Sequence, residues 1–102
     1  MLQISYSPEA ENALREVFFY TADNWGLPQA RKYQQDFSDA FDIIAKTPNI
    51  GKNHPPISLE YRIFPVNKHL IIYRTTESEL FIVAIIHMAM DVEERLQKLL
   101  EN

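Results

Sequence analysis

The chain has 102 residues, of which 46% are hydrophobic and 24% charged, a composition typical of one folded domain spanning residues 1–102. It contains no cysteine, which excludes disulfides and thiolate metal sites and fits a reducing cytoplasm. We expect no secretory signal and no membrane span, because no basic region precedes an apolar run and no apolar run approaches roughly 20 residues.

The net charge of −4 is unevenly distributed along the sequence. Residues 1–45 hold three bases and seven acids, and residues 75–102 hold two bases and six acids, so each segment carries −4. Residues 46–74 carry +4, from five bases and one acid. The five bases are Lys46, Lys52, Arg62, Lys68 and Arg74. This basic segment is either a solvated face or a surface for an acidic partner, protein or nucleic acid.

The first elements are a short strand and a helix. Leu2, Ile4 and Tyr6 alternate with polar residues, which predicts a strand. Ser7 then supplies an N-cap hydroxyl, and Pro8 suits the first helical position because its missing N–H is not needed there. Apolar residues at helical spacing follow until the segment 24–28, where Gly26 is expected to end the helix.

The second helix is the clearest element of the sequence. Its apolar stripe comprises Ala30, Tyr33, Phe37, Ala40, Phe41 and Ile44. Thr47-Pro48 is expected to end it. Because the link between the two helices is so short, we expect them to fold back as a hairpin that shares its apolar faces.

Three strands are predicted after a loop at residues 49–58, which is rich in glycine, asparagine and proline. They cover residues 61–66, 69–75 and 80–87, and the two short links between them are typical of hairpin turns. Pro65 places the first of these strands at a sheet edge or a bulge. The third is apolar on both faces and is therefore expected to be the most central.

A final helix is predicted after Asp91, which is a suitable N-cap residue with Glu94 three positions later. Its apolar side is expected to comprise Val92, Leu96, Leu99 and Leu100. The predicted fold is therefore α+β, with the helical hairpin packed on a mostly antiparallel four-stranded sheet in the order β-α-α-β-β-β-α.

Few kinds of catalytic chemistry fit this sequence. Two glycines cannot build a glycine-rich phosphate loop, and the spacing of the three histidines matches no compact metal-ligand pattern, so no cofactor or metal is expected. General acid–base cleavage of RNA would need His87, a tyrosine such as Tyr61 or Tyr73, and nearby cations. Residues 75–94 contain no lysine or arginine, which argues against that reaction.

Several residues have a structural interpretation beside a functional one. His87 at a strand end is more often a hydrogen-bonded structural histidine than a catalyst. Trp25 is expected to fill the helical hairpin rather than to act as a binding anchor. Met88 and Met90 either fill the core or, if exposed together, form a soft contact surface. Arg62 and Arg74 on adjacent strands are either a binding surface or partners of acids on the helices.

The sequence resembles the ParE branch of the RelE/ParE toxin family over nearly its whole length. The similar segments are the Trp25-Gly26 break, the loop "TPNIGK" at 47–52, the hairpin "YRIFPV" followed by "HLIIYR", and the ending "IIHMAMD" at 85–91. The resemblance implies a small bacterial toxin of a type II toxin–antitoxin pair. Such toxins poison DNA gyrase and are neutralised by a cognate, ParD-like antitoxin protein.

The resemblance, together with the basic segment, suggests two contact surfaces. The expected gyrase-binding residues are Arg62, Lys68, Arg74, His87, Met88, Met90 and Asp91. The expected antitoxin-binding residues are Leu14, Val17, Phe18, Tyr33, Phe37 and Phe41 on the helical hairpin. Binding without catalysis is expected, with no sequence-specific contact to nucleic acid.

Two alternatives remain open at this point. RelE toxins share the fold and cleave mRNA on the ribosome with arginines, lysines and a C-terminal tyrosine. Here Leu70 and Ala89 stand where that branch tends to carry arginines, and the last helix has no tyrosine. The other alternative is a non-toxic relative kept as a binding module.

Overall fold

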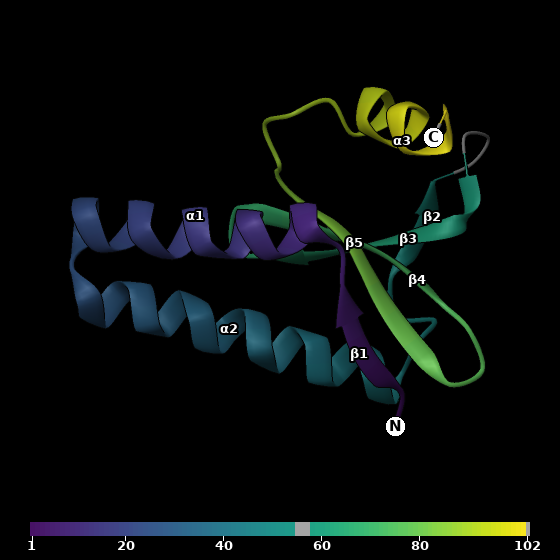
Figure 1. The fold of residues 1–102 in the computed structure, drawn as a ribbon, viewed down its shortest axis with the longest axis horizontal. Helices are drawn as coiled ribbons and strands as arrows, with labels where there is room; N and C mark the ends of the chain where they lie inside the picture. The colour runs from purple at the N-terminus through teal and green to yellow at the C-terminus, as the bar shows by residue number, and fades with distance from the viewer. Residues whose placement is uncertain (55–57, 102) are drawn as a thin grey trace.

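The computed structural model describes residues 1–54 and 58–101, so the Pro55-Pro56 part of the expected loop lies outside the described residues. Figure 1 shows the elements in chain order. They are β1 (Gln3–Tyr6), α1 (Pro8–Trp25), α2 (Leu27–Lys46), β2 (Lys52–His54), β3 (Ser58–Val66), β4 (His69–Thr75), β5 (Glu79–His87) and α3 (Val92–Glu101). The predicted α+β class is confirmed.

Local signals set the ends of the helical hairpin as predicted. The Ser7 hydroxyl oxygen accepts a hydrogen bond from the Ala10 N–H at 2.9 Å, which satisfies one free donor of the first turn of α1. The same hydroxyl donates to the Val83 carbonyl of β5 at 2.6 Å. Gly26, at a φ of 91°, separates α1 from α2. The N-cap therefore also ties α1 to the sheet.

The sheet has five strands in the described residues, in the order β1-β5-β4-β3-β2. β1 runs parallel to β5, and all the other pairs are antiparallel. The expected arrangement of four strands is therefore wrong by one, because β2 adds to the sheet. The middle strand is β4, not β5 as expected, although β5 has a neighbour on each side.

β2 was expected to be loop because its sequence is polar and carries turn residues. It pairs with β3 through Lys52 opposite Ile63 and Asn53 opposite Arg62. A strand of three residues on a sheet edge needs little intrinsic propensity, because an existing neighbour supplies the hydrogen bonds. Pro65 lies beyond these β2 pairs, where β3 is an edge, in agreement with its expected position.

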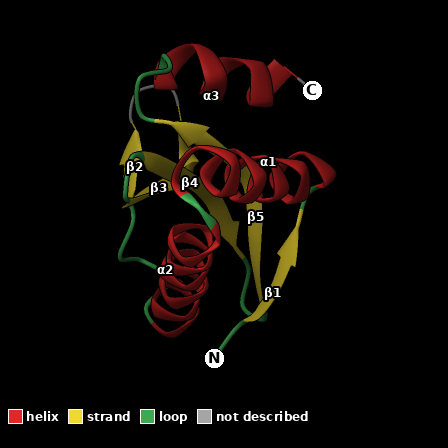
Figure 2. Ribbon diagram, turned by 90° about the vertical axis from the view of Figure 1, so that its left-hand side faces the viewer, coloured by secondary structure: helices red, strands yellow, loops and turns green. Residues whose placement is uncertain are grey.

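The main core lies between the helical hairpin and one face of the sheet. Figure 2 shows α1 and α2 on the near side of the sheet, and α3 separate from the pair. The buried members of this core are Ala10, Phe37, Ala40, Phe41, Ile44, Ala45, Val66, Ile71, Tyr73, Leu80, Ile82 and Ile85. Four residues of the apolar stripe predicted for α2 belong to this core, namely Phe37, Ala40, Phe41 and Ile44. The ring of Tyr6 of β1 lies edge-on to that of Phe41, with 5.5 Å between the ring centroids.

A smaller core on the other face lies under α3. Its buried members are Ile72, Ala84, Ile86 and Leu96. Val92 and Leu99 pack against them, whereas the Leu100 side chain lies outside the described residues. An ion pair between Arg95 and Glu9 joins α3 to the start of α1. Asp91 accepts a hydrogen bond from the Glu94 N–H at 3.2 Å, which confirms it as the N-cap residue.

A β-bulge at Val83 determines which residues of β5 face the main core and which face the smaller core. Ile72 pairs with Ala84 and Tyr73 pairs with Ile82, so Val83 has no partner across the strand. The extra residue lets Ile82 and Ile85 face the same core. None of the helices in the described part of the chain is long and apolar enough to cross a membrane.

Candidate functional site

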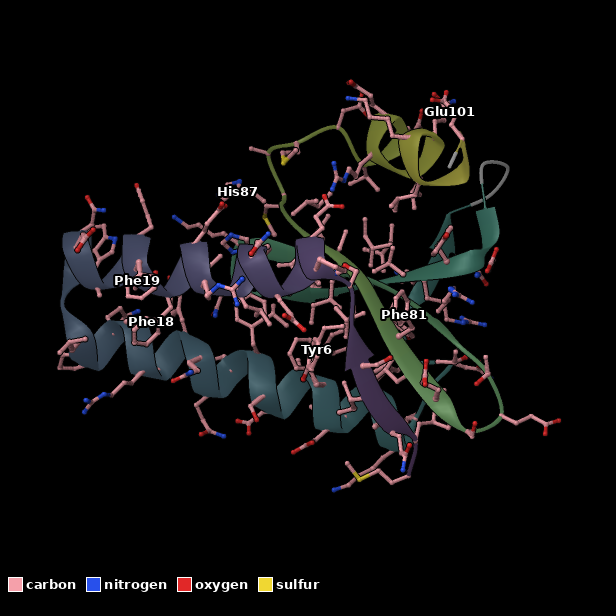
Figure 3. All side chains as sticks on the ribbon, in the orientation of Figure 1. Tyr6, Phe18, Phe19, Phe81, His87 and Glu101 are labelled. Carbon is pink, nitrogen blue, oxygen red and sulfur yellow. The ribbon has the colours of Figure 1, made fainter. Side chains whose placement is uncertain are left out.

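A groove runs between α1 and α2, with a volume of about 730 Å³. All six expected antitoxin-binding residues line it, beside Phe19 and others. Its charged lining residues in the described chain are Arg15 and Arg31, with no acid among them. Figure 3 shows Phe18 and Phe19 on the half of α1 that lies farther from β1. The groove is thus apolar inside and positively charged at its rim.

A second cleft, of about 470 Å³, is also bordered by α1. Its lining residues come from both helices, the β3–β4 turn and the end of β5. They are Glu16, Val17, Tyr20, Thr21, Trp25, Tyr33, Lys68, His69 and His87. Val17 and Tyr33 line the groove as well as the cleft, so the two depressions share these two side chains.

Two histidines meet in this cleft across β4 and β5. His69 and His87 are directly opposite each other, and their ring centroids are 5.3 Å apart. The other side of the His69 ring meets Phe37 of the main core at 6.0 Å. Burial lowers the pKa of His69, and the nearby His87 lowers it further. His69 is therefore held neutral over a wider pH range than an exposed histidine.

The tautomer of His87 follows from its hydrogen bond. Its Nδ1 accepts the Ala89 N–H at 3.0 Å, so in the neutral ring the proton sits on Nε2. This agrees with the structural interpretation of a hydrogen-bonded histidine at a strand end. It also leaves an exposed ring edge that can donate a hydrogen bond to a partner.

Residues 87–91 connect the end of β5 to α3, and we call this segment the corner. Met88 and Met90 are 48% and 50% exposed, so they are not core residues. The Met88 N–H donates to the Lys68 carbonyl at 2.9 Å, and the Met90 N–H donates to the His87 carbonyl at 2.9 Å. The corner is therefore fixed to the β3–β4 turn and presents two flexible apolar side chains.

The other basic residues of the expected gyrase surface lie elsewhere. Arg62 donates to the carbonyls of Gly51 at 2.8 Å and Asn49 at 3.3 Å. Arg74 pairs with Glu60 at 3.7 Å and lies over the Phe81 ring at 5.1 Å. Among the described residues, neither arginine pairs with an acid on the helices, which had been one interpretation.

The expected gyrase-binding set is therefore divided in space. His69 pairs with His87 at one end of β4, and Arg74 lies five residues away, roughly 17 Å at the usual rise per residue. Alternation along the strands also places Arg62 and Arg74 on opposite faces of the sheet. Lys68, His87, Met88, Met90 and Asp91 are brought together, whereas Arg62 and Arg74 are not part of that group.

Trp25 corrects one expectation from the sequence. It was expected to fill the hairpin, but it is 73% exposed, and Tyr20 is 67% exposed. Trp25 is the last residue of α1, and its ring lies outside the core that the hairpin shares with the sheet. The spacing of Val17, Thr21 and Trp25 at four-residue intervals is the sequence signal that could have placed Trp25 on the face of α1 that borders the cleft.

Tyr73, one of the two tyrosines considered for acid–base chemistry, does not line the cleft that contains His87. Tyr73 is fully buried, and its hydroxyl donates to the Pro48 carbonyl at 2.8 Å and accepts the Gly51 N–H at 2.9 Å. It lies at the opposite end of β4 from His87. Within residues 1–54 and 58–101, no three potential metal ligands come together.

Comparisons with known proteins agree with the resemblance found in the sequence. The family described as "ParE toxin of type II toxin-antitoxin system, parDE" matches residues 4–92. Toxin ParE1 of Mycobacterium tuberculosis is 35% identical over 91 residues, which cover 88% of this chain and 93% of that protein. Toxin ParE1 of Caulobacter vibrioides is 24% identical over 90 residues, with the same coverage of each chain.

Solved structures show the same fold. A chain of the chromosomal ParDE TA system from P. aeruginosa matches with a TM-score of 0.71 at 18% identity, covering 85% of this chain and 96% of that one. The YoeB dimer from Staphylococcus aureus matches with a TM-score of 0.63 at 17% identity, covering 84% and 95%. Given the family match over residues 4–92 and the 35% identity to the mycobacterial toxin, this chain belongs to the ParE toxin family of type II toxin–antitoxin systems.

Proposed function

We propose that this ParE-family toxin inhibits DNA gyrase by direct binding, with no catalysis of its own, and that a cognate antitoxin neutralises it. Membership of the ParE family supports gyrase as the target, and the corner supports direct binding as the mode of action. Met88 and Met90 are half exposed beside Lys68 and His87, on a backbone fixed by hydrogen bonds. This combination of flexible apolar side chains on a rigid support is the observation that carries the proposal, because it is typical of a protein-binding surface.

A supercoiling assay with purified gyrase tests the proposal. The protein should inhibit supercoiling in a dose-dependent way, and replacement of both corner methionines by alanine should weaken inhibition about tenfold or more. Ile43→Ala is the matched control, because Ile43 is an exposed apolar residue that lines neither depression. A complete lack of inhibition at every toxin-to-gyrase ratio would refute gyrase as the target.

The antitoxin is proposed to occupy the groove between α1 and α2. The apolar lining suits the apolar face of an amphipathic segment, and Arg15 and Arg31 at the rim suit acidic residues beside that face. Such a segment is expected to fold on binding, as small antitoxin tails without a core of their own would. The expected antitoxin-binding residues from the sequence lie together in this one groove.

The product of the small reading frame beside the toxin gene is the partner to test. At one hundred times its dissociation constant it should raise the free energy of unfolding of the toxin by about 2.7 kcal/mol. Phe19→Ala, in the groove, should weaken binding, whereas Ile43→Ala should not. If the product confers no thermal stabilisation, this part of the proposal fails independently of the gyrase assay.

Ribonuclease activity gains no support from the cleft around His87. Lys68 is the only lysine or arginine among the described residues that line it, and RNA binding relies on several cations to contact phosphates. The second alternative, a non-toxic binding module, predicts that the protein does not affect growth. Induced expression should arrest growth if the toxin proposal holds.

A further inference from the structure

We propose that the target-facing surface of this toxin extends from the corner onto α1, where Trp25 and Tyr20 anchor a partner segment that presents an apolar side chain beside a carboxylate. The inference rests on the proposed function, in which the corner faces gyrase. It assigns the whole of the second cleft to the target, beyond the Lys68 and His87 expected from the sequence, and leaves the groove between α1 and α2 to the antitoxin.

The exposure of the two aromatic rings is the first argument. Trp25 is 73% exposed and Tyr20 is 67% exposed, and both line the cleft. The fold does not use either ring as core, so folding alone gives no reason for these large apolar side chains to be there. Tryptophan and tyrosine are also the residues that most often contribute the largest share of binding energy in protein interfaces.

The charges around the cleft indicate the chemistry of the partner. The whole chain carries −4, whereas the described residues that line the cleft include one base, Lys68, and one acid, Glu16, beside two histidines that can act as hydrogen-bonding groups. The Nε2–H of His87 is available as a donor because its Nδ1 accepts the Ala89 N–H. A carboxylate would complement Lys68 and this donor, whereas a nucleic acid would require more cations.

The cleft is continuous with the corner. Lys68 and His87 line the cleft, and the Met88 N–H donates to the Lys68 carbonyl, so the methionines begin where the cleft ends. A partner that contacts Met88 can therefore reach Trp25 without crossing the groove. Figure 3 shows His87 next to α1 in agreement with this continuity.

The assignment also suggests how the two partners compete. Val17 and Tyr33 line the groove on one side and the cleft on the other. An antitoxin segment in the groove contacts the same two side chains that support the cleft. Target and antitoxin would then bind surfaces that differ in their exposed residues but share these two.

The experiment compares Trp25→Ala, Tyr20→Ala and Lys68→Glu with the Ile43→Ala control, using the full chain, purified gyrase and the antitoxin. All four positions are exposed, so the urea midpoints should match that of the wild type. We expect the three cleft variants to need about tenfold more toxin for half-inhibition of supercoiling and to keep wild-type affinity for the antitoxin. The control should behave as the wild type in both assays.

Three results would overturn the inference. If the wild type inhibits gyrase and Trp25→Ala inhibits equally well, the inference fails while the proposed function stands. If the wild type does not inhibit gyrase, the proposed function fails and the inference falls with it. Trp25 is the only tryptophan of the chain, so a change in tryptophan fluorescence reports binding of a ligand at the cleft. Quenching by a single-stranded oligouridine at micromolar concentration would assign the cleft to nucleic acid instead.

Discussion

The two ends of β4 carry similar residues in different states. At the end near Thr75, Tyr73 is buried with its hydroxyl bonded to Pro48 and Gly51, and Arg74 pairs with Glu60. At the end near His69, Lys68 and His87 are exposed beside two exposed methionines. A positive charge counted along the sequence is therefore not the same as a positive charge available to a partner.

This difference has a physical origin in the loop after α2. Residues 47–51 follow the helix, and their backbone groups need partners from elsewhere in the fold. Arg62 donates to the carbonyls of Asn49 and Gly51. The Tyr73 hydroxyl donates to the Pro48 carbonyl and accepts the Gly51 N–H. Basic and aromatic side chains at that end serve the fold. At the end near His69, the corner is bonded to the β3–β4 turn through backbone groups, so the side chains of Lys68 and His87 remain exposed.

Tyr73→Phe should show the largest effect at the buried end. The substitution leaves the Gly51 N–H and the Pro48 carbonyl without their partner, which should lower the free energy of unfolding by about 1–3 kcal/mol. Urea denaturation followed by circular dichroism measures it. An unchanged midpoint would mean that the Tyr73 hydroxyl does not hold the 47–51 loop in place.

Arg62→Ala should have a smaller effect of the same kind. It removes two hydrogen bonds to backbone carbonyls from a half-buried guanidinium, which should cost about 1 kcal/mol of stability. At a temperature where the variant is fully folded, its inhibition of gyrase should equal that of the wild type. A loss of inhibition without a loss of stability would restore Arg62 to the target-facing surface.

His69 should make stability depend on pH. Burial lowers its pKa in the folded protein, so below the unfolded value of about 6.5 the unfolded chain binds more protons than the folded one. The stability that the neutral ring contributes is thus fully present above that value and is lost as pH falls toward the lowered folded pKa. Urea midpoints between pH 7.5 and 5 should decline for the wild type and decline less for His69→Gln. Equal slopes would contradict the prediction.

Lys68→Ala should have the smallest effect on stability and serves as the counterpart of Arg62→Ala. The side chain is exposed at a turn, so the free energy of unfolding should change by no more than about 0.5 kcal/mol. Inhibition of gyrase should nevertheless weaken. If Lys68→Ala destabilises the protein as much as Arg62→Ala, the contrast between the two ends of β4 is lost.

Much of the fold was predictable because its signals are local. Ser7 and Pro8 start α1, Gly26 ends it, and Asp91 caps α3, each through groups that lie within four residues. The six antitoxin candidates lie on apolar helix faces that periodicity predicts without reference to the rest of the chain, whereas the antitoxin itself was implied by the family resemblance. When two such helices form a hairpin, their apolar faces meet, and the six residues therefore line one groove.

The candidate site was less predictable because its members are distant in sequence. Trp25 joins Lys68 and His87 only because α1, the β3–β4 turn and the end of β5 border the same cleft. The pairing of His69 with His87 depends on the register between β4 and β5. The spacing of residues along the sequence does not predict this register.

By itself, the sequence determined the helices, their caps, the three consecutive strands and the family, because each of these rests on neighbouring residues or on the whole ordered pattern. The tertiary structure alone decided that β1 pairs with β5, that Lys52–His54 adds a fifth strand, and that Arg62 and Arg74 lie far from His87. The reason is physical: strand pairing, burial and the use of a charge depend on what a residue meets across the fold, and a charge bound to the protein's own backbone is no longer available to a partner.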